Sequence, residues 1–113
     1  MADAQTTSRI DDALIEEIVR RVLSVAQPEK IILFGSAAAG AMTRDSDIDL
    51  LIVEAGPFDR RKEYVRIRRA LAGMGYPFDI LFISLDWFQA SKNVVGGVAY
   101  PANKYGTVVY EAA

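Results

Sequence analysis

Hydrophobic residues follow two different periods along the chain. They recur three or four positions apart over 10–23 and 59–74, and they form short, nearly all-hydrophobic runs over 30–34, 48–53 and 78–83. The first spacing lines one side of a helix with hydrophobic side chains, whereas short, nearly all-hydrophobic runs are typical of buried strands. The pattern therefore predicts helices and strands in alternation, as in an α/β domain.

Polar residues, glycine and proline mark the expected ends of these elements. Pro28 follows the first helix and is expected to end it. Asp59 can cap the next helix, which is expected to run to residue 74 and to close at Gly75. Ser84 can cap a further short helix that runs through Ser91. The inner side of the helix that follows Asp59 is expected to carry Tyr64, Ile67, Leu71 and Met74.

The C-terminal third of the chain is less regular. The run 107–110 is compatible with a last strand. Hydrophobic residues over 93–104 have helical spacing, but Gly96-Gly97 and Pro101 interrupt them, so this segment is left unassigned. We expect most of the hydrophobic side chains in this third to pack in the core. A small domain cannot bury all of them, which leaves a partner interface as the alternative for the remainder.

The composition is that of one small globular domain. The 113 residues are 51% hydrophobic and 25% charged, and they contain no repeat or linker. We therefore expect a single domain over 1–113, with the polar segment 1–9 as a flexible N-terminus. No hydrophobic signal core opens the chain, and no run is long enough to span a bilayer, so we expect a cytoplasmic protein without membrane contact.

Two missing residue types limit the chemistry. The chain contains neither cysteine nor histidine, which excludes disulfides, thiolate zinc sites and catalysis by either side chain. A formal net charge of −2 gives no overall attraction to nucleic acid, and direct nucleic-acid binding is not expected. The helix after Asp59 is rich in arginine and lysine. We interpret this charge as a solvated helix face, with docking of an acidic partner or a nucleic acid as the alternative.

The strongest candidate for chemistry is a pair of aspartates that follows a glycine–serine turn. Gly35 and Ser36 end the first hydrophobic run. Asp47 and Asp49 lie on either side of Ile48, where the second run begins. Side chains alternate along a strand, so both aspartates point to one side while Ile48 points into the core. Like charges on a buried strand are costly unless cations are bound. The pattern predicts metal-assisted phosphoryl or nucleotidyl transfer.

The turn itself has two interpretations. A glycine at the end of a strand lets a phosphate approach the backbone, and Ser36 adds a hydroxyl and an amide that can bind phosphate oxygens. Taken alone, Gly35 and Ser36 are better explained as a plain strand-to-helix turn with Ser36 as its N-cap. Only the paired aspartates that follow favour the functional interpretation.

A third carboxylate strengthens the prediction. Asp79 interrupts the otherwise hydrophobic run 78–83. If that strand lies beside the strand of Asp49, a cross-strand neighbour sits within about 5 Å. Three carboxylates at that distance can share a pair of metal ions. An aspartate that begins a strand and faces water is the alternative.

Together these residues resemble the nucleotidyltransferase superfamily that includes DNA polymerase beta. The resemblance rests on Gly35-Ser36, ten residues, Asp47-x-Asp49 and a later strand that carries Asp79. The run Ser-Asp-Ile-Asp-Leu-Leu over 46–51 is most similar to the minimal nucleotidyltransferase branch. The resemblance implies an α/β nucleotidyltransferase fold, which is a small mixed sheet backed by helices.

The resemblance also implies roles for the site residues. Asp47, Asp49 and Asp79 would be catalytic and would hold two Mg²⁺ ions, and Asp79 would be the base for the incoming hydroxyl. Gly35 and Ser36 would bind the nucleotide. The reaction implied is attack on the α-phosphate of ATP with release of pyrophosphate. Minimal members commonly pair with a small helical HEPN-domain protein as antitoxins, in some cases by transferring AMP to a tyrosine of that partner.

One departure from the family pattern concerns the turn. Many such chains carry arginines where this one has Ala37 and Ala39, which predicts weaker binding of the triphosphate. Arg44 and Lys62 are candidate substitutes. We expect an Mg²⁺- and ATP-dependent adenylyltransferase that acts on a protein partner. A non-catalytic antitoxin subunit and a transferase for a small hydroxylated molecule are the alternatives, and self-association is left open.

Overall fold

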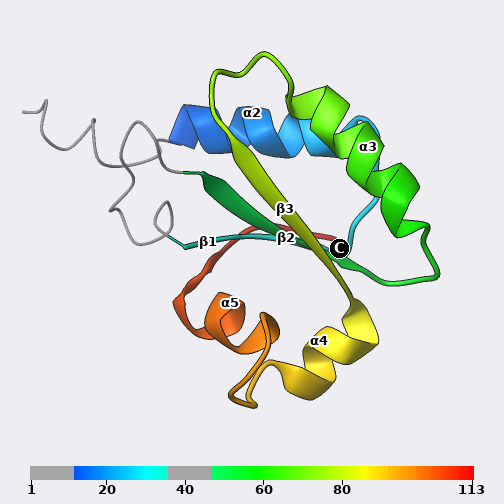
Figure 1. Ribbon diagram of the computed structural model, residues 1–113, viewed down its shortest axis with the longest axis vertical. Helices are drawn as coiled ribbons and strands as arrows, with labels where there is room; N and C mark the ends of the chain where they lie inside the picture. The colour runs from blue at the N-terminus through cyan, green and yellow to red at the C-terminus, as the bar shows by residue number, and fades with distance from the viewer. Residues whose placement is uncertain (1–11, 36–46) are drawn as a thin grey trace, which may run out of the picture.

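A mixed β-sheet forms the centre of the fold (Figure 1). The computed structural model describes residues 12–35 and 47–113, and the expected flexible segment 1–9 lies outside them. Within the described residues the elements in chain order are α2 Asp12–Leu23, β1 Lys30–Phe34, β2 Ile48–Glu54, α3 Arg60–Leu71, β3 Phe78–Ser84, α4 Leu85–Ser91, α5 Ala99–Tyr105 and β4 Thr107–Glu111.

The strand order across the sheet is β3-β2-β1-β4. β1 pairs antiparallel with both β2 and β4, whereas β2 and β3 are parallel. Parallel neighbours need a crossover connection, and α3 supplies it between β2 and β3. The two strands that carry the predicted aspartates are therefore adjacent, with their N-terminal ends at the same edge of the sheet.

Helices cover both faces of the sheet (Figure 1). Alternating residues of the strands supply two separate hydrophobic cores, as expected for a sheet buried on both sides. The core under α2 and α3 contains Ile18, Val22, Ile31, Leu33, Ile48, Leu50, Ile52, Ile67, Leu71 and Ile80. The core under α4 and α5 contains Ile32, Leu51, Val53, Ile83, Phe88, Ala99 and Ala102. Glu54 is the one buried charged residue among those described.

The strands confirm the predictions made from the hydrophobic runs. β1 has the predicted bounds, and β2, β3 and β4 each extend one residue further than predicted, to Glu54, Ser84 and Glu111. Short hydrophobic runs are easily assigned because burial on both faces leaves little room for polar residues. The prediction of a mixed sheet backed by helices is correct.

The starts of α3 and α4 are also as predicted, because their caps are local. The Asp59 side chain accepts a hydrogen bond from the Lys62 backbone N–H at 3.2 Å, and α3 begins immediately afterwards. Ser84 Oγ accepts a hydrogen bond from the Trp87 N–H at 3.1 Å and caps α4. Such bonds satisfy backbone donors that have no partner within the helix.

Two predicted helix ends are wrong. α2 ends at Leu23 rather than at Pro28, because Ser24 Oγ donates a 2.6 Å hydrogen bond to the Arg21 carbonyl and competes with the helical backbone. α3 ends at Leu71 instead of continuing to residue 74. Ala72 is extended there, and Gly73 has a φ of +86°, a conformation that glycine adopts without strain.

The inner side of α3 differs from the prediction at one residue, and the structure assigns the segment that the sequence left open. Ile67 and Leu71 are buried on the inner side of α3 as predicted, but Tyr64 is 38% exposed. Within 93–104, residues from Ala99 onward form α5, and Pro101 lies in its first turn, where a missing N–H costs no helical bond. No helix in the part of the chain described here is long and hydrophobic enough to cross a membrane.

Candidate functional site

Two of the predicted aspartates are direct neighbours in the sheet. The register of β2 and β3 pairs Asp49 with Asp79, and on the other side Asp49 pairs with Phe34 of β1. Neighbouring strands lie about 4.8 Å apart, so two carboxylates at paired positions stand side by side on one face. The predicted adjacency of these aspartates is therefore confirmed, while their catalytic roles stay predictions.

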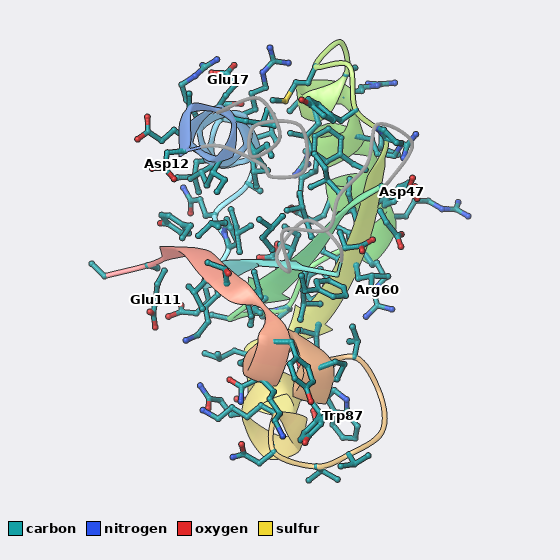
Figure 2. All side chains as sticks on the ribbon, turned by 90° about the vertical axis from the view of Figure 1, so that its left-hand side faces the viewer. Asp12, Glu17, Asp47, Arg60, Trp87 and Glu111 are labelled. Carbon is teal, nitrogen blue, oxygen red and sulfur yellow. The ribbon has the colours of Figure 1, made fainter. Side chains whose placement is uncertain are left out.

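The carboxylates occupy the open end of their sheet face. Alternation places Asp49 on the same face as Leu51 and Val53, which α4 and α5 cover. Toward the other end of that face, Asp79 and Leu81 are exposed, and Asp47, which immediately precedes β2, is exposed as well. Figure 2 shows Asp47 far along the molecule from Trp87 on α4. A ligand can therefore reach all three aspartates without displacing any described helix.

Gly35 immediately follows β1 and lies directly against the Asp49 carboxylate. A Cβ built at position 35 would overlap Asp49 Oδ2, and the φ of Gly35 is +74°. Both the close approach and the left-handed backbone favour glycine over any other residue. The predicted glycine thus has a definite task, because it makes room for the half-buried carboxylate. Ser36, the other predicted nucleotide-binding residue, lies outside the described residues.

The three aspartates interact electrostatically. Burial raises the pKa of Asp49 above its ordinary value, and the negative charges of Asp79 and then Asp47 raise it further. Each of these causes makes the ionised form of Asp49 costly in the absence of a cation. The site is therefore suited to a ligand that supplies positive charge.

The donor set fits Mg²⁺ in part. Carboxylate oxygens are suitable ligands for this hard cation, and Asp49 and Asp79 stand side by side. As the side chains lie, no group of three acidic residues within 12–35 and 47–113 is arranged to hold a metal ion. Mg²⁺ in nucleotide sites is commonly held by one or two carboxylates together with substrate phosphates. The described residues match that arrangement better than a site made of protein ligands alone.

The structure separates Lys62 from this site. Lys62 lies in the first turn of α3 and lines a cavity next to Glu54, at the other end of β2 from Asp49. The prediction that Lys62 substitutes for the missing turn arginines is therefore wrong. Arg44, the other candidate, and Ala37 and Ala39 lie outside the described residues.

Sequence reasoning missed Glu54. This residue ends a hydrophobic run and resembles a polar strand end, yet it is only 7% exposed. Alternation along β2 places it on the face of Ile48, Leu50 and Ile52, and this period could have indicated a buried acid.

The mixed sheet places paired carboxylates on neighbouring strands, beside a glycine turn. Such a site is suited to phosphoryl transfer. The chain belongs to the nucleotidyltransferase domain family, whose model matches residues 14–97. By sequence, no curated protein matches the chain.

Solved structures share the fold. A toxin–antitoxin complex with AMP-PNP has a TM-score of 0.67 and 17% identity, over 87% of this chain and 73% of that chain. A mutant of the toxin–antitoxin pair MntA-HpeT has a TM-score of 0.64 and 14% identity, over 87% and 73%. A tri-AMPylated Shewanella oneidensis HEPN toxin in complex with MNT antitoxin has a TM-score of 0.55 and 16% identity, over 87% and 70%. This confirms the α/β nucleotidyltransferase fold predicted from the sequence.

Proposed function

We propose that the chain is an Mg²⁺-dependent nucleotidyltransferase that moves AMP from ATP to a hydroxyl of a HEPN-type partner protein, as the antitoxin of a toxin–antitoxin pair. The observation that carries this proposal is the register pairing of Asp49 with Asp79 beside the Gly35 turn. Membership of the nucleotidyltransferase family supports the reaction class. The three solved relatives, each a toxin–antitoxin complex, support the biological context.

Each described residue has a definite task in the proposed reaction. Gly35 leaves space for a phosphate oxygen and for the Asp49 carboxylate. Asp47 and Asp49 would hold Mg²⁺, which neutralises the charge on the triphosphate when bound. Asp79, exposed at the open end of the sheet, takes the proton of the acceptor hydroxyl. The acceptor oxygen then forms a bond to the α-phosphorus, and the bond from that phosphorus to the bridging oxygen breaks. Pyrophosphate leaves with the electron pair.

The test is transfer of label from α-labelled ATP to a HEPN-type protein, sought first in the gene next to that of this chain, in the presence of Mg²⁺. Loss of a general base commonly lowers a rate by about 10²–10⁴-fold. We expect a loss of that size in Asp79→Asn, without loss of the complex. Asp86→Asn is the matched control, because Asp86 is an exposed aspartate on α4, outside the site. Equal labelling by wild type and Asp79→Asn contradicts the assigned role.

A second candidate is a non-catalytic antitoxin that neutralises its partner by covering it. It is favoured by alanine at the two turn positions, Ala37 and Ala39, where the resemblance described above leads us to expect arginine. The same experiment distinguishes the two functions. Tight, inhibitory binding of the partner without any label favours the covering mechanism. If a small hydroxylated molecule is labelled and no partner protein binds, the chain is instead a transferase that acts on such a molecule.

A further inference from the structure

One edge of the sheet lies beside an arginine-rich side of α3. β3 ends the strand order, so among the described residues only β2 pairs with it (Figure 1). The Ile48 N–H donates to the Pro77 carbonyl, and Ile48 lies opposite Phe78 in the parallel register. Backbone polar groups alternate in direction along a strand, so Phe78, Ile80 and Phe82 direct theirs away from β2. Such an edge can accept another strand.

Two arginines of α3 reach this edge. Arg68 Nη1 lies 3.4 Å from the Phe78 carbonyl oxygen, and Arg60 Nη2 lies 3.5 Å from the Phe82 carbonyl oxygen. The dimensions of the two elements agree with this arrangement. The helix rises about 12 Å from Arg60 to Arg68, and the strand spans about 13 Å from Phe78 to Phe82. The arginines therefore lie along the edge, each over a carbonyl that points away from β2.

The arginines beside the edge lack acidic partners. Among the described residues, no ion pair contains Arg60, Arg61 or Arg68. The guanidinium of Arg68 instead lies 5.6 Å from the centre of the Tyr64 ring. The two bonds to β3, at 3.4 and 3.5 Å, are longer than the usual range of about 2.7–3.2 Å. A carboxylate binds guanidinium more strongly than a neutral carbonyl does, so an acidic ligand can draw both groups off the edge.

A groove of about 520 Å³ lies between α3 and the edge. This edge groove is lined by Arg60, Arg61, Tyr64, Ile80, Leu81 and Phe82. It is partly hydrophobic, since Tyr64 is 38% exposed and Leu81 36%. A strand laid against β3 places every second side chain on the side of α3. The groove therefore fits an extended segment with acidic residues four positions apart, near Arg60 and Arg68, and a hydrophobic residue midway between them, near Tyr64.

We propose that the β3 edge docks an extended, acidic segment of a protein partner, which adds to the sheet as a strand. Carboxylates of that segment pair with Arg60 and Arg68. Its backbone N–H groups then bond to the Phe78 and Phe82 carbonyls that the arginines release. A segment without acidic residues leaves the arginines on the edge, so the exchange selects acidic partners. The inference concerns docking alone and does not depend on nucleotide transfer.

Two other occupants fit the edge less well. An antiparallel pair of β3 strands centred on Ile80 would bring Arg60 of one copy near Arg68 of the other, and these like charges repel. A nucleic acid would bind the arginines through its phosphates, but it has no row of backbone N–H donors for the outward carbonyls of β3. A peptide strand can satisfy both the arginines and the carbonyls.

The test titrates the full chain with a threonine heptapeptide that carries glutamate at its second and sixth positions and valine at its fourth. We expect Arg60→Gln/Arg68→Gln to weaken binding about 10-fold or more in an NMR titration, because two charge-assisted pairs are lost. Arg20→Gln/Arg69→Gln is the matched control, since it removes as many charges from exposed positions outside the groove. The same peptide with lysine in place of glutamate should also bind about 10-fold more weakly or worse.

Amide hydrogen exchange distinguishes strand addition from binding through side chains alone. The Ile80 N–H points away from β2 and should exchange about 10-fold more slowly at saturating peptide. The Leu81 N–H points toward β2 and serves as the internal reference. Methylation of one of the two alternating sets of peptide nitrogens should abolish binding, because only that set faces the β3 carbonyls.

Four outcomes overturn the inference. The first is that the glutamate peptide does not bind, and the second is that it binds equally to wild type and Arg60→Gln/Arg68→Gln. The third is binding without slower exchange at Ile80. The fourth is another occupant: slow exchange at Ile80 in a dimer without peptide assigns the edge to a second copy, and arginine-dependent binding of single-stranded polyuridine in place of the peptide assigns it to nucleic acid. Asp49→Asn should bind the peptide as wild type does, which separates this test from that of the proposed function.

Discussion

At the scale of single residues, Asp49 and Gly35 form one unit although thirteen residues separate them in the chain. The sequence indicates both residues, and strand alternation predicts the side that Asp49 faces. It does not indicate that Gly35 and Asp49 touch, because that contact depends on the antiparallel pairing of β1 with β2. The reason for a glycine at position 35 is therefore more specific than phosphate access alone.

Gly35→Ala tests this contact. A left-handed backbone costs an L-residue about 1–2 kcal/mol, and a Cβ at this position also overlaps Asp49 Oδ2. Gly73→Ala is the matched control, since Gly73 has a φ of +86° but no atom within 4 Å of its Cβ position. We expect Gly35→Ala to lower the free energy of unfolding more than Gly73→Ala does, as measured by denaturant titration. Equal losses in the two variants would mean that the overlap with Asp49 is relieved without cost.

At the scale of elements, the strand bounds and the starts of α3 and α4 could be predicted from the sequence, whereas two helix ends could not. A strand start or a cap depends on a few adjacent residues, such as Asp59 or Ser84. The end of α3 depends on where the chain must turn to reach β3, which is set by tertiary packing. At the early end of α2, Ser24 donates a side-chain hydrogen bond to the Arg21 carbonyl, which the spacing of the hydrophobic residues does not reveal.

The cap at Ser84 connects β3, the strand of Asp79, to α4, and it can be tested directly. Ser84→Ala removes the acceptor for the Trp87 N–H at the start of α4. We expect a loss of about 1 kcal/mol in the free energy of unfolding. Ser84→Asp keeps an acceptor at the same position and should retain most of the stability, measured by thermal or denaturant unfolding. If Ser84→Ala is as stable as wild type, water replaces the cap without cost.

At the scale of the whole molecule, β3 takes part in two features, the aspartate group (Asp47, Asp49 and Asp79) and the edge groove. The sequence predicts the aspartate group because its members lie on hydrophobic strands with a recognisable spacing. It does not predict the edge groove, because Arg60 and Arg68 reach β3 only when α3 folds back along that strand. Local spacing reveals a site built on strands, and a surface between a strand and a helix needs the tertiary structure.

The aspartate group makes a prediction in which the sign of a mutation depends on the ligand. Because the pKa of Asp49 is raised in the folded state, its ionised form destabilises the fold at pH values above that pKa. The penalty disappears as the pH falls below the ordinary value of 3.8. Without ligand, Asp49→Asn should therefore raise the melting temperature at neutral pH, and the gain should vanish under acid conditions. Glu16→Gln, at an exposed position of α2, should show no such gain.

With Mg²⁺ and a non-hydrolysable ATP analogue, the wild type should instead have a higher melting temperature than Asp49→Asn. A ligand at 100 times its Kd stabilises the folded state by about 2.7 kcal/mol, or roughly 10 °C for a domain of this size. Wild type should gain this shift, whereas Asp49→Asn and the Asp47→Asn/Asp49→Asn double variant should not. Without a cation the Asp49 carboxylate repels its acidic neighbours, but the same carboxylate is needed to bind the cation. Glu54→Gln should keep the shift, since Glu54 lies on the other face. An unchanged shift in the double variant contradicts the metal assignment, because the ligand would then bind elsewhere.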